Sequence, residues 1–361
     1  MENILKSVVL LMSLMAAGGH AIGADSARPG MPQFEVDRGW PQMPAKWKLG
    51  DASSIALDAQ DNVYVLHRPR TLKPEDASMA APPVMVFDAS GRYLKSWGGA
   101  GSGFEWPERE HGIHIDRNGH VWIGGNNCPE GGNPGLKPIA DDALLKFTLD
   151  GKFLLQIGRS NQSKGDADTA NVHRAADAWV DARTNEVFVA DGYGNHRVIV
   201  FDSDTGKFKR TWGAFAKPPG GVDHCTVTAP KNFPDTVGPP DYNVVHAIRV
   251  SNDGMVYVAD RENRRLQVFT TDGTFVRQIV RPDVSFARDL ALSPDAEQRY
   301  LYVGGGKGIF VIDRQSFTII GAIQVPGQIG PGHHIATDSK GNIYIAQTSA
   351  GMQKLVFKGI K

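Results

Sequence analysis

The sequence has few of the features that mark nucleic-acid-binding or membrane proteins. Lys plus Arg and Asp plus Glu each total 39, so no net charge would attract nucleic acid or an acidic surface. The one long apolar run, Ser7–Ala17, is too short to span a bilayer. There are only two cysteines and no C-x-x-C spacing, which argues against a zinc ion held by cysteines.

Residues 1–24 have the pattern of a secretory signal, although an uncleaved anchor is the alternative. Lys6 supplies the positive charge, and small residues up to Ala24 supply a cleavage site. We expect a secreted or periplasmic protein with no membrane attachment after cleavage. In such an oxidising compartment Cys128 and Cys225 are free to pair, but the sequence leaves their pairing open.

Glycine and proline are abundant, at 41 and 22 residues, without a collagen-like period, which is typical of a fold with many tight turns. Aligning the chain on itself gives six copies of a unit with up to four short apolar runs, which read as two β-hairpins. Each copy contains an apolar–aromatic–apolar triplet: Val63–Val65, Val121–Ile123, Val187–Val189, Val256–Val258, Leu301–Val303 and Ile343–Ile345.

The spacing of the triplets predicts an all-β, six-bladed β-propeller. The spacings run from 42 to 69 residues, and the shorter ones match propeller blades. We expect the propeller to cover residues 50–361, with residues 25–49 supplying the strand that closes the ring. Three insertions rich in proline and glycine break the spacing, and long loops of this kind either carry function or have no role: Thr71–Pro83, Asn126–Asp142 and Ala214–Asn243.

Three histidines share one phase of the repeat. His111, His246 and His333 each lie ten residues before a triplet, at the start of the first strand of a unit. Residues that share a phase in a circular repeat project to equivalent places around one axis. Three convergent imidazoles with an open fourth position describe a catalytic zinc site, whereas a lone tunnel histidine is usually bonded to backbone.

The end of the second strand of each unit is a second repeating position. It brings further polar residues to the same rim, because the end of the second strand lies beside the start of the first. It contains Arg68 and Arg261, and Tyr193 follows one residue after it; Asp177 shares the histidine phase. The arginines either tie loops together or bind a carboxylate. Beside zinc and an arginine, a tyrosine gives up its proton more readily and can act as a base. Asp177 either orients a histidine or caps its strand.

Two longer motifs resemble a known family. The run Ala259–Gln267 (ADRENRRLQ) resembles the ADRENGRIQ signature of the peptidyl-α-hydroxyglycine α-amidating lyases, which are propellers of NHL repeats, and Asp191–Arg197 (DGYGNHR) resembles their DGYCNSR segment. The resemblance covers about residues 50 to 350. Shorter matches are His67-Arg68 to "HR", His111-Gly112-Ile113 to "PHGL", Val245-His246 to "PHS" and Gly332-His333-His334 to "MPHD".

The resemblance implies a lyase that splits an α-hydroxyglycine amide into an amide and glyoxylate. It implies that His111, His246 and His333 bind Zn²⁺ and that Tyr193 is the base. It also implies that Arg68 and Arg261 hold the substrate and polarise Tyr193. The partner would be a peptide or small molecule with a C-terminal carboxylate, and we expect a monomer.

The sequence departs from the family at several places. The aspartate that the family uses for a calcium is His334 here, which puts calcium in doubt and leaves His334 and Asp177 as possible accessory ligands. The family's cysteine after the tyrosine is Gly194, and the prolines before the first two histidines are Glu110 and Val245. Two other functions stay open. One is a non-catalytic propeller that binds a partner through its rim loops, and the other is a metal-dependent hydrolase or lactonase.

Overall fold

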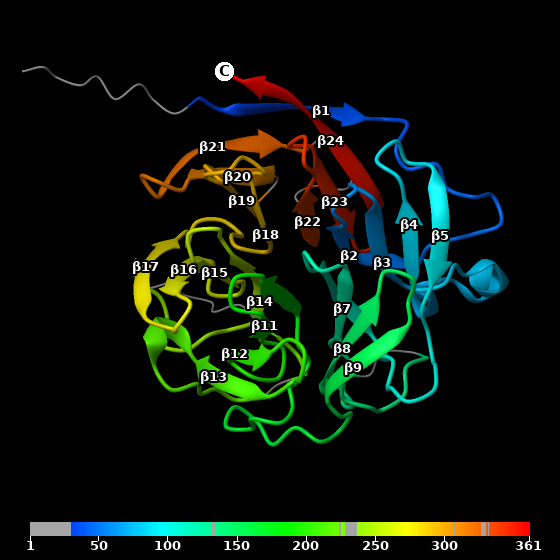
Figure 1. The fold of residues 1–361 in the computed structure, drawn as a ribbon, viewed down its shortest axis with the longest axis horizontal. Coiled ribbons are helices and arrows are strands. Elements are labelled where there is room, and N and C mark those ends of the chain that lie inside the picture. Colours follow the sequence, from blue (N-terminus) through cyan, green and yellow to red (C-terminus); the bar gives the residue numbers. More distant parts are fainter. Residues whose placement is uncertain are drawn as a thin grey trace, which may run out of the picture.

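Six four-stranded antiparallel sheets are arranged as blades around a central axis in the computed structural model (Figure 1). The structure describes residues 30–131, 135–223, 225–227, 237–306, 308–325, 330 and 332–361. The expected signal, residues 1–24, lies outside the described residues. The six sheets confirm the prediction of an all-β, six-bladed propeller.

In blades 1 to 5 the strands follow the chain from the axis outwards. Blade 1 consists of β2 (Asp51–Leu57), β3 (Val63–Arg68), β4 (Val84–Phe87) and β5 (Tyr93–Trp97). Blade 2 consists of β6 (Glu110–Ile115), β7 (His120–Gly125), β8 (Ala143–Thr148) and β9 (Phe153–Gly158). Blades 3 and 4 are β10 (Asp177–Asp181), β11 (Glu186–Asp191), β12 (Arg197–Asp202), β13 (Phe208–Trp212), and β14 (Val245–Val250), β15 (Met255–Asp260), β16 (Arg265–Thr270), β17 (Phe275–Val280).

The last two blades close the ring. They are β18 (Leu290–Leu292), β19 (Tyr300–Gly305), β20 (Gly308–Asp313), β21 (Thr318–Gln324), and β22 (His334–Thr337), β23 (Ile343–Gln347), β24 (Gly351–Ile360), β1 (Pro32–Asp37). Strand β1, from the segment before residue 50, pairs antiparallel with β24 and supplies the outer strand of blade 6 (Figure 1). The inner strand β22 also contacts β2 of blade 1, so the ring of inner strands is continuous.

The triplet aromatics explain how the blades pack. All six are buried, and six hydrophobic clusters each join two neighbouring blades. The turn after an inner strand is held by its aspartate: Asp116 accepts hydrogen bonds from the amides of Asn118 and His120 and from the indole of Trp122. The same side chain therefore forms the turn and anchors the aromatic residue.

In the part of the chain that the structure describes, helix is limited to three short 3₁₀ segments, η1 (Pro69–Thr71), η2 (Pro74–Met79) and η3 (Ala214–Ala216). Among the described residues, no helix has the length and apolar character needed to cross a membrane. Two of the insertions predicted from the sequence, Asn126–Asp142 in blade 2 and Ala214–Asn243 between blades 3 and 4, are joined by a disulfide. It links Cys128 to Cys225, whose Cα atoms lie 5.6 Å apart. The pairing that the sequence left open is thus formed in the structure.

Candidate metal centre

Three histidines from alternate blades meet at one end of the central tunnel. His111 belongs to blade 2, His246 to blade 4, and His333 lies just ahead of blade 6. In β6 and β14 the pairing register shifts where the histidine stands, between Glu110 and Ile113 and between Val245 and Ala247. Such β-bulges re-aim a side chain, and here they coincide with histidines that face the axis.

Each of these histidines is oriented by the next blade around the ring. The Nδ1 atoms of His111, His246 and His333 donate hydrogen bonds to the carbonyl oxygens of Ala176, Arg288 and Ser53, at 2.8, 2.5 and 2.7 Å. A carbonyl oxygen can only accept, so Nδ1 carries the proton and Nε2 keeps its lone pair. This is the tautomer and the type of second contact found for metal-binding histidines.

A fourth imidazole, that of His334, joins the cluster. One nitrogen from each of His111, His246, His333 and His334 lies within 4.8 Å of the others. The Nε2 atoms of His246 and His334 are buried without a hydrogen-bond partner among the described residues. An unsatisfied buried polar atom costs about 1–3 kcal/mol, and a ligand would remove that cost. The cluster therefore fits a metal that prefers nitrogen ligands, such as zinc.

The charge state of these rings also suits a cation. Burial, followed by the neighbouring His333 and His246, lowers the pKa of His111 well below its ordinary value. Burial, followed by the charge of Arg68, lowers the pKa of His333 to about 3. The imidazoles are therefore neutral at pH 7, which is the form that binds metals.

Tyr193 lies beside this cluster. Its hydroxyl is 3.0 Å from His111 Nε2 and accepts a hydrogen bond of 2.7 Å from Arg261 Nη1. The Arg261 guanidinium also sits 5.2 Å above the Tyr193 ring and binds Glu262 through Nε. Burial lowers the pKa of Arg261, but the charges of Tyr193 and Glu262 raise it by more, so the net shift is upward. The base and one of the arginines expected from the sequence are thus in direct contact.

Arg68 reaches the same cavity from blade 1 without a hydrogen bond to Tyr193 among those described. Its Nε donates to the carbonyl oxygen of Glu110 at 2.7 Å, which fixes the guanidinium beside His111. Burial, followed by the charge of Arg109, lowers the pKa of Arg68 to about 10. A cation that is both buried and near other cations favours an anionic ligand.

A cavity of about 320 Å³ opens above the histidines. Its described lining contains four arginines and no carboxylate: Arg68, Arg109, Asn126, Cys128, Gly131, Arg174, Tyr193, Cys225, Val227, Arg261, His333 and Thr348. Sequence analysis missed Arg109, Arg174 and the disulfide wall. Arg109 precedes the histidine phase, and Arg174 lies in the loop between β9 and β10, so neither follows the repeat.

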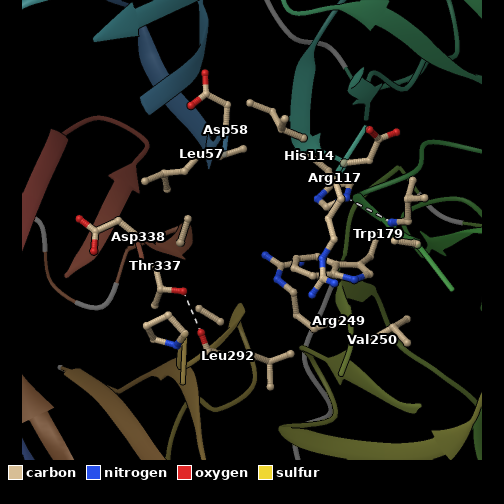
Figure 2. Close-up of a pocket in the computed structure, with 18 of the residues that line it drawn as sticks. Leu57, Asp58, His114, Arg117, Trp179, Arg249, Val250, Leu292, Thr337 and Asp338 are labelled. Atoms are coloured by element: carbon tan, nitrogen blue, oxygen red, sulfur yellow. Dashed lines mark hydrogen bonds between the residues drawn. The ribbon is translucent and has the colours of Figure 1, made fainter. Parts of the chain in front are cut away.

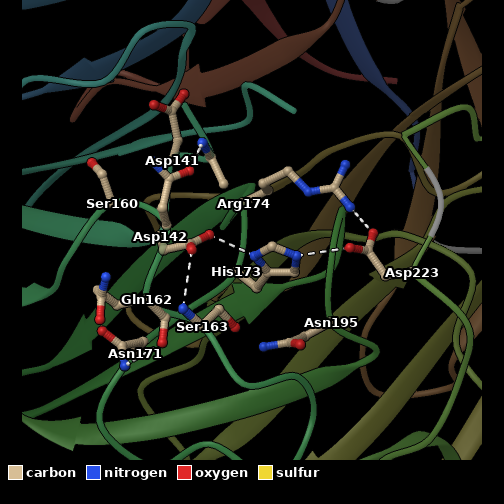
Figure 3. A network of polar contacts seen from close by, with 12 residues as sticks. Asp141, Asp142, Ser160, Gln162, Ser163, Asn171, His173, Arg174, Asn195 and Asp223 are labelled. Atoms are coloured by element: carbon tan, nitrogen blue, oxygen red, sulfur yellow. Dashed lines mark hydrogen bonds and ion pairs between the residues drawn. The ribbon is translucent and has the colours of Figure 1, made fainter. Parts of the chain in front are cut away.

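A polar network anchors one wall of this cavity. The ring of His173 lies between two carboxylates, with Nδ1 2.5 Å from Asp142 and Nε2 2.9 Å from Asp223 (Figure 3). Asp223 also contacts the buried guanidinium of Arg174 (Figure 3). Because Asp223 lies two residues before the disulfide cysteine Cys225, the network and the disulfide hold the same loop against the cavity.

Asp177 does not orient any of the histidines. In blade 3 its strand pairs regularly with β11, without a bulge at this position. Its carboxylate accepts hydrogen bonds from the amide of Ile248 at 3.1 Å and from Arg249 at 2.5 Å. Arg249 also pairs with Asp289 at 3.4 Å. Among the described residues Asp177 makes no hydrogen bond to a histidine, but its carboxylate lies within 4.8 Å of a ring nitrogen of His334. Its role as an accessory ligand therefore stays a prediction.

Arg249 faces the opposite end of the tunnel. A cavity of about 380 Å³ opens there, lined by the ends of the inner strands and the turns that follow them, and Arg249 projects into it beside Trp179 and His114 (Figure 2). Burial lowers the pKa of Arg249, but the charges of Asp177 and Asp289 raise it by more, so the pKa lies above its ordinary value. Arg249 is therefore a fixed internal cation.

The two long motifs have a structural part as well. Asp191 binds Arg197 Nε and the Asn195 amide, both at 2.8 Å. Asp260 binds Arg265 Nε at 2.7 Å and the Asn263 amide at 2.8 Å in the same arrangement. Both aspartates and both arginines are fully buried. Each motif thus forms a buried ion pair that fixes the loop carrying Tyr193 or Arg261.

No family model matches the chain. It is 28% identical over 291 residues to peptidyl-glycine alpha-amidating monooxygenase A of Xenopus laevis, and the aligned region covers 76% of this chain and 27% of that protein. It is 24% identical over 343 residues to peptidyl-alpha-hydroxyglycine alpha-amidating lyase 2 of Drosophila melanogaster, covering 87% and 72%. It is 24% identical over 247 residues to NHL repeat-containing protein 3 of Mus musculus, covering 67% and 58%.

The chain therefore spans little more than a quarter of the length of the Xenopus monooxygenase and most of the length of the Drosophila lyase. These identities are low, but they extend over most of the propeller. The chain is a six-bladed β-propeller distantly related to peptidyl-α-hydroxyglycine α-amidating lyases and to NHL repeat proteins.

Proposed function

We propose that the chain is an exported, zinc-dependent lyase that cleaves an α-hydroxyglycine-type amide into an amide and glyoxylate. The observation that carries this proposal is the contact of the Tyr193 hydroxyl with both His111 Nε2 and Arg261. It brings a base, a cation and a metal-binding imidazole together. Export is supported by the disulfide, which persists in oxidising compartments, and by the expected signal at residues 1–24.

The substrate would enter with its carboxylate towards the arginines. Arg68 and Arg261 both line the cavity, and a guanidinium binds a carboxylate through two parallel hydrogen bonds. The carbinol carbon, next to the carboxylate, would then lie close to Tyr193. Arg109 adds positive charge to the same cavity, whereas the charge of Arg174 is balanced by Asp223, so the net charge of the lining favours an anionic substrate.

The reaction needs one proton to move from oxygen to nitrogen. Tyr193 would take the proton of the carbinol hydroxyl; the carbon–oxygen bond becomes a carbonyl as the carbon–nitrogen bond breaks. The leaving amide nitrogen then receives a proton, and Tyr193 is placed to return it. To act in this way Tyr193 must be a phenolate before it takes the proton and again after it returns it, and Arg261 stabilises that phenolate form.

His111, His246 and His333 would hold the zinc ion through Nε2, since their protonated Nδ1 atoms are bound to backbone. At His111 the ion would take the place of the Tyr193 hydroxyl as the partner of Nε2. When bound there, zinc supplies a Lewis acid that makes the carbinol hydroxyl more acidic. Calcium does not fit this centre, because it takes oxygen ligands and the cluster offers imidazoles. The same donor set argues against a lactonase that relies on a hard cation.

The decisive assay is glyoxylate release from α-hydroxyhippurate by the mature protein, with zinc restored in one sample and a chelator added to another. We expect release that depends on zinc. Stoichiometric zinc without glyoxylate would instead favour a different substrate or a non-catalytic propeller that binds a partner, as the similarity to NHL repeat-containing protein 3 allows.

Tyr193→Phe tests the base directly. Loss of a general base lowers turnover by about 100- to 10,000-fold, and we expect this loss with an unchanged zinc content. Tyr93→Phe on the outer strand β5 is the matched control and should keep full activity. If Tyr193→Phe loses zinc together with activity, Tyr193 belongs to the metal shell and is not the base.

A further inference from the structure

The four imidazoles of the metal centre form a nearly regular tetrahedron. All six distances between the ring centres of His111, His246, His333 and His334 lie between 4.7 and 5.4 Å. With zinc–nitrogen bonds of 2.0–2.1 Å and tetrahedral angles, four imidazoles bound through Nε2 have ring centres about 5.2 Å apart. The observed distances fall within about 0.5 Å of this value. The three to His334 are 5.4, 5.3 and 4.8 Å and include the two longest, so His334 lies at the outer edge of the range but within it.

Adjacent residues of a regular strand point to opposite faces, so His333 and His334 would normally diverge. Here His333 lies just before β22, and the ring centres of the two residues are 4.8 Å apart. The chain turns at Gly332, which has a φ of +81°, and a Cβ atom there would lie 2.4 Å from Ile345 Cγ2. The local backbone thus requires glycine and leaves both imidazoles on the axis.

His334 is also held as a ligand would be. Its Nδ1 atom lies 3.6 Å from the Asp289 carboxylate, which Arg249 and the amide of Ile335 fix in place. Its Nε2 atom is buried and has no hydrogen-bond partner among the described residues. At 3.6 Å this contact is longer than a hydrogen bond, but a carboxylate beside one ring nitrogen favours the tautomer in which that nitrogen carries the proton and the other is free for a metal.

We propose that His334 is a fourth imidazole ligand, which completes a tetrahedral shell with His111, His246 and His333. This deepens the proposed function, because it rests on the metal of that function but not on its reaction. A catalytic zinc normally keeps one position open. In this chain a substrate would have to add a fifth ligand or displace His334, so His334 limits access of the substrate to the metal.

Cobalt(II) loaded into the wild-type protein provides the test. Each bound imidazole whose Nδ1–H is shielded from water gives one strongly shifted, exchangeable proton signal in the NMR spectrum. We expect four such signals, one for each histidine of the cluster. Three signals would overturn the proposal, and this count needs no variant.

His334→Ala gives the second readout. Removing a partner that only orients a ligand costs about 10- to 100-fold in metal affinity, so removing the ligand itself should cost at least about 100-fold. We also expect one proton signal fewer and a visible absorption spectrum changed by entry of water. His120→Ala, at the start of β7 outside the cluster, is the matched control and should leave affinity and spectrum unchanged.

An unchanged cobalt affinity and spectrum in a folded His334→Ala protein would overturn the proposal. The outcome is separate from that of the lyase assay. Four signals without glyoxylate release would leave the His334 assignment intact and reject the proposed reaction. Three signals with glyoxylate release would overturn the His334 assignment and support the proposed reaction.

Discussion

The central tunnel contains two adjacent buried groups of ionisable side chains, which meet where His334 lies 3.6 Å from Asp289. The histidine level consists of His111, His246, His333 and His334, and the arginine level consists of Arg249 with Asp177 and Asp289. At the arginine level every charge faces an opposite charge. At the histidine level two Nε2 atoms have no partner among the described residues. The arginine level is thus complete as built, whereas the histidine level keeps two nitrogen atoms that a ligand would satisfy.

The two levels are coupled through the alternation of blades. Blades 2, 4 and 6 supply the histidines, and the amide two residues after each histidine is bound by a side chain from the blade before it. These side chains are Ser54, Asp177 and Asp289, which accept from Ile113, Ile248 and Ile335. The hydroxyl of Ser54 and the carboxylates of Asp177 and Asp289 therefore hold the strand starts in place, so that the imidazoles can converge.

Breaking the arginine level should have the largest effect on stability. Arg249→Met leaves Asp177 and Asp289 buried without their cation, which should lower the free energy of unfolding by about 3–5 kcal/mol. Urea denaturation of the metal-free protein measures this loss. Adding Asp177→Asn and Asp289→Asn to the variant should recover part of it. Arg92→Met, on the exposed Asp88 pair, is the control, and an equal loss there would contradict the prediction.

Breaking the disulfide, which lies at the histidine end of the tunnel, should lower stability without changing metal binding. Cys128 and Cys225 are separated by 97 residues and line the cavity above the histidines. Replacing both with alanine should lower the free energy of unfolding by about 2–5 kcal/mol. Cobalt affinity should stay near that of the wild type, since the ligands come from inner-strand starts and not from the linked loops. A reductant should reproduce the loss in the wild type and change nothing in the double variant.

Breaking the histidine level should cost binding and little stability. His246→Leu removes the unpartnered Nε2 atom but also the hydrogen bond from Nδ1 to the Arg288 carbonyl oxygen. These two effects act in opposite directions, so the metal-free protein should change by less than about 1.5 kcal/mol. Cobalt affinity should fall at least about 100-fold, by the reasoning given for His334. Parallel urea denaturation and cobalt titration measure both quantities. A metal-free loss as large as that of Arg249→Met would mean that the histidines are structural.

The sequence predicts the histidine level better than the arginine level, for a geometric reason. In a propeller, one phase of the repeat maps to one radial position, and this relation placed His111, His246, Arg68 and Arg261 at the same end of the tunnel. Asp177 has the histidine phase but lies in a strand without a bulge, and the bulges are not visible in the spacing. Its pairing with Arg249 joins two blades and has no signature along the chain.

Residues in the long loops between strands were the least predictable. Arg174 and the disulfide lie in loops whose lengths differ between units, so the repeat gives them no position. Whether Cys128 meets Cys225 depends on the distance between two loops of different blades, which the order of residues does not encode. The fold was predictable because the six triplets repeat a short-range pattern, whereas these contacts depend on how the blades are arranged.

The smallest effect we predict is on the pH dependence of stability at the histidine level. In the metal-free protein burial lowers the pKa of His333 to about 3, from 6.5 for an exposed imidazole. Above pH 6.5 the ring is neutral in both the folded and the unfolded state, so stability does not depend on this group. Between pH 6.5 and 3 only the unfolded state takes up the proton, so the contribution of His333 to stability is lost as the pH falls.

A difference between two proteins isolates this contribution from the buried carboxylates, whose raised pKa values act in the opposite direction. Relative to His333→Ala, the wild type should lose up to about 1.4 kcal/mol of unfolding free energy for each pH unit below 6.5. Urea denaturation of both metal-free proteins at pH 7.5, 6.5 and about 5.5 gives the comparison. A constant difference would show that His333 titrates alike in both states, and the histidine level would then be open to water rather than held neutral for a metal.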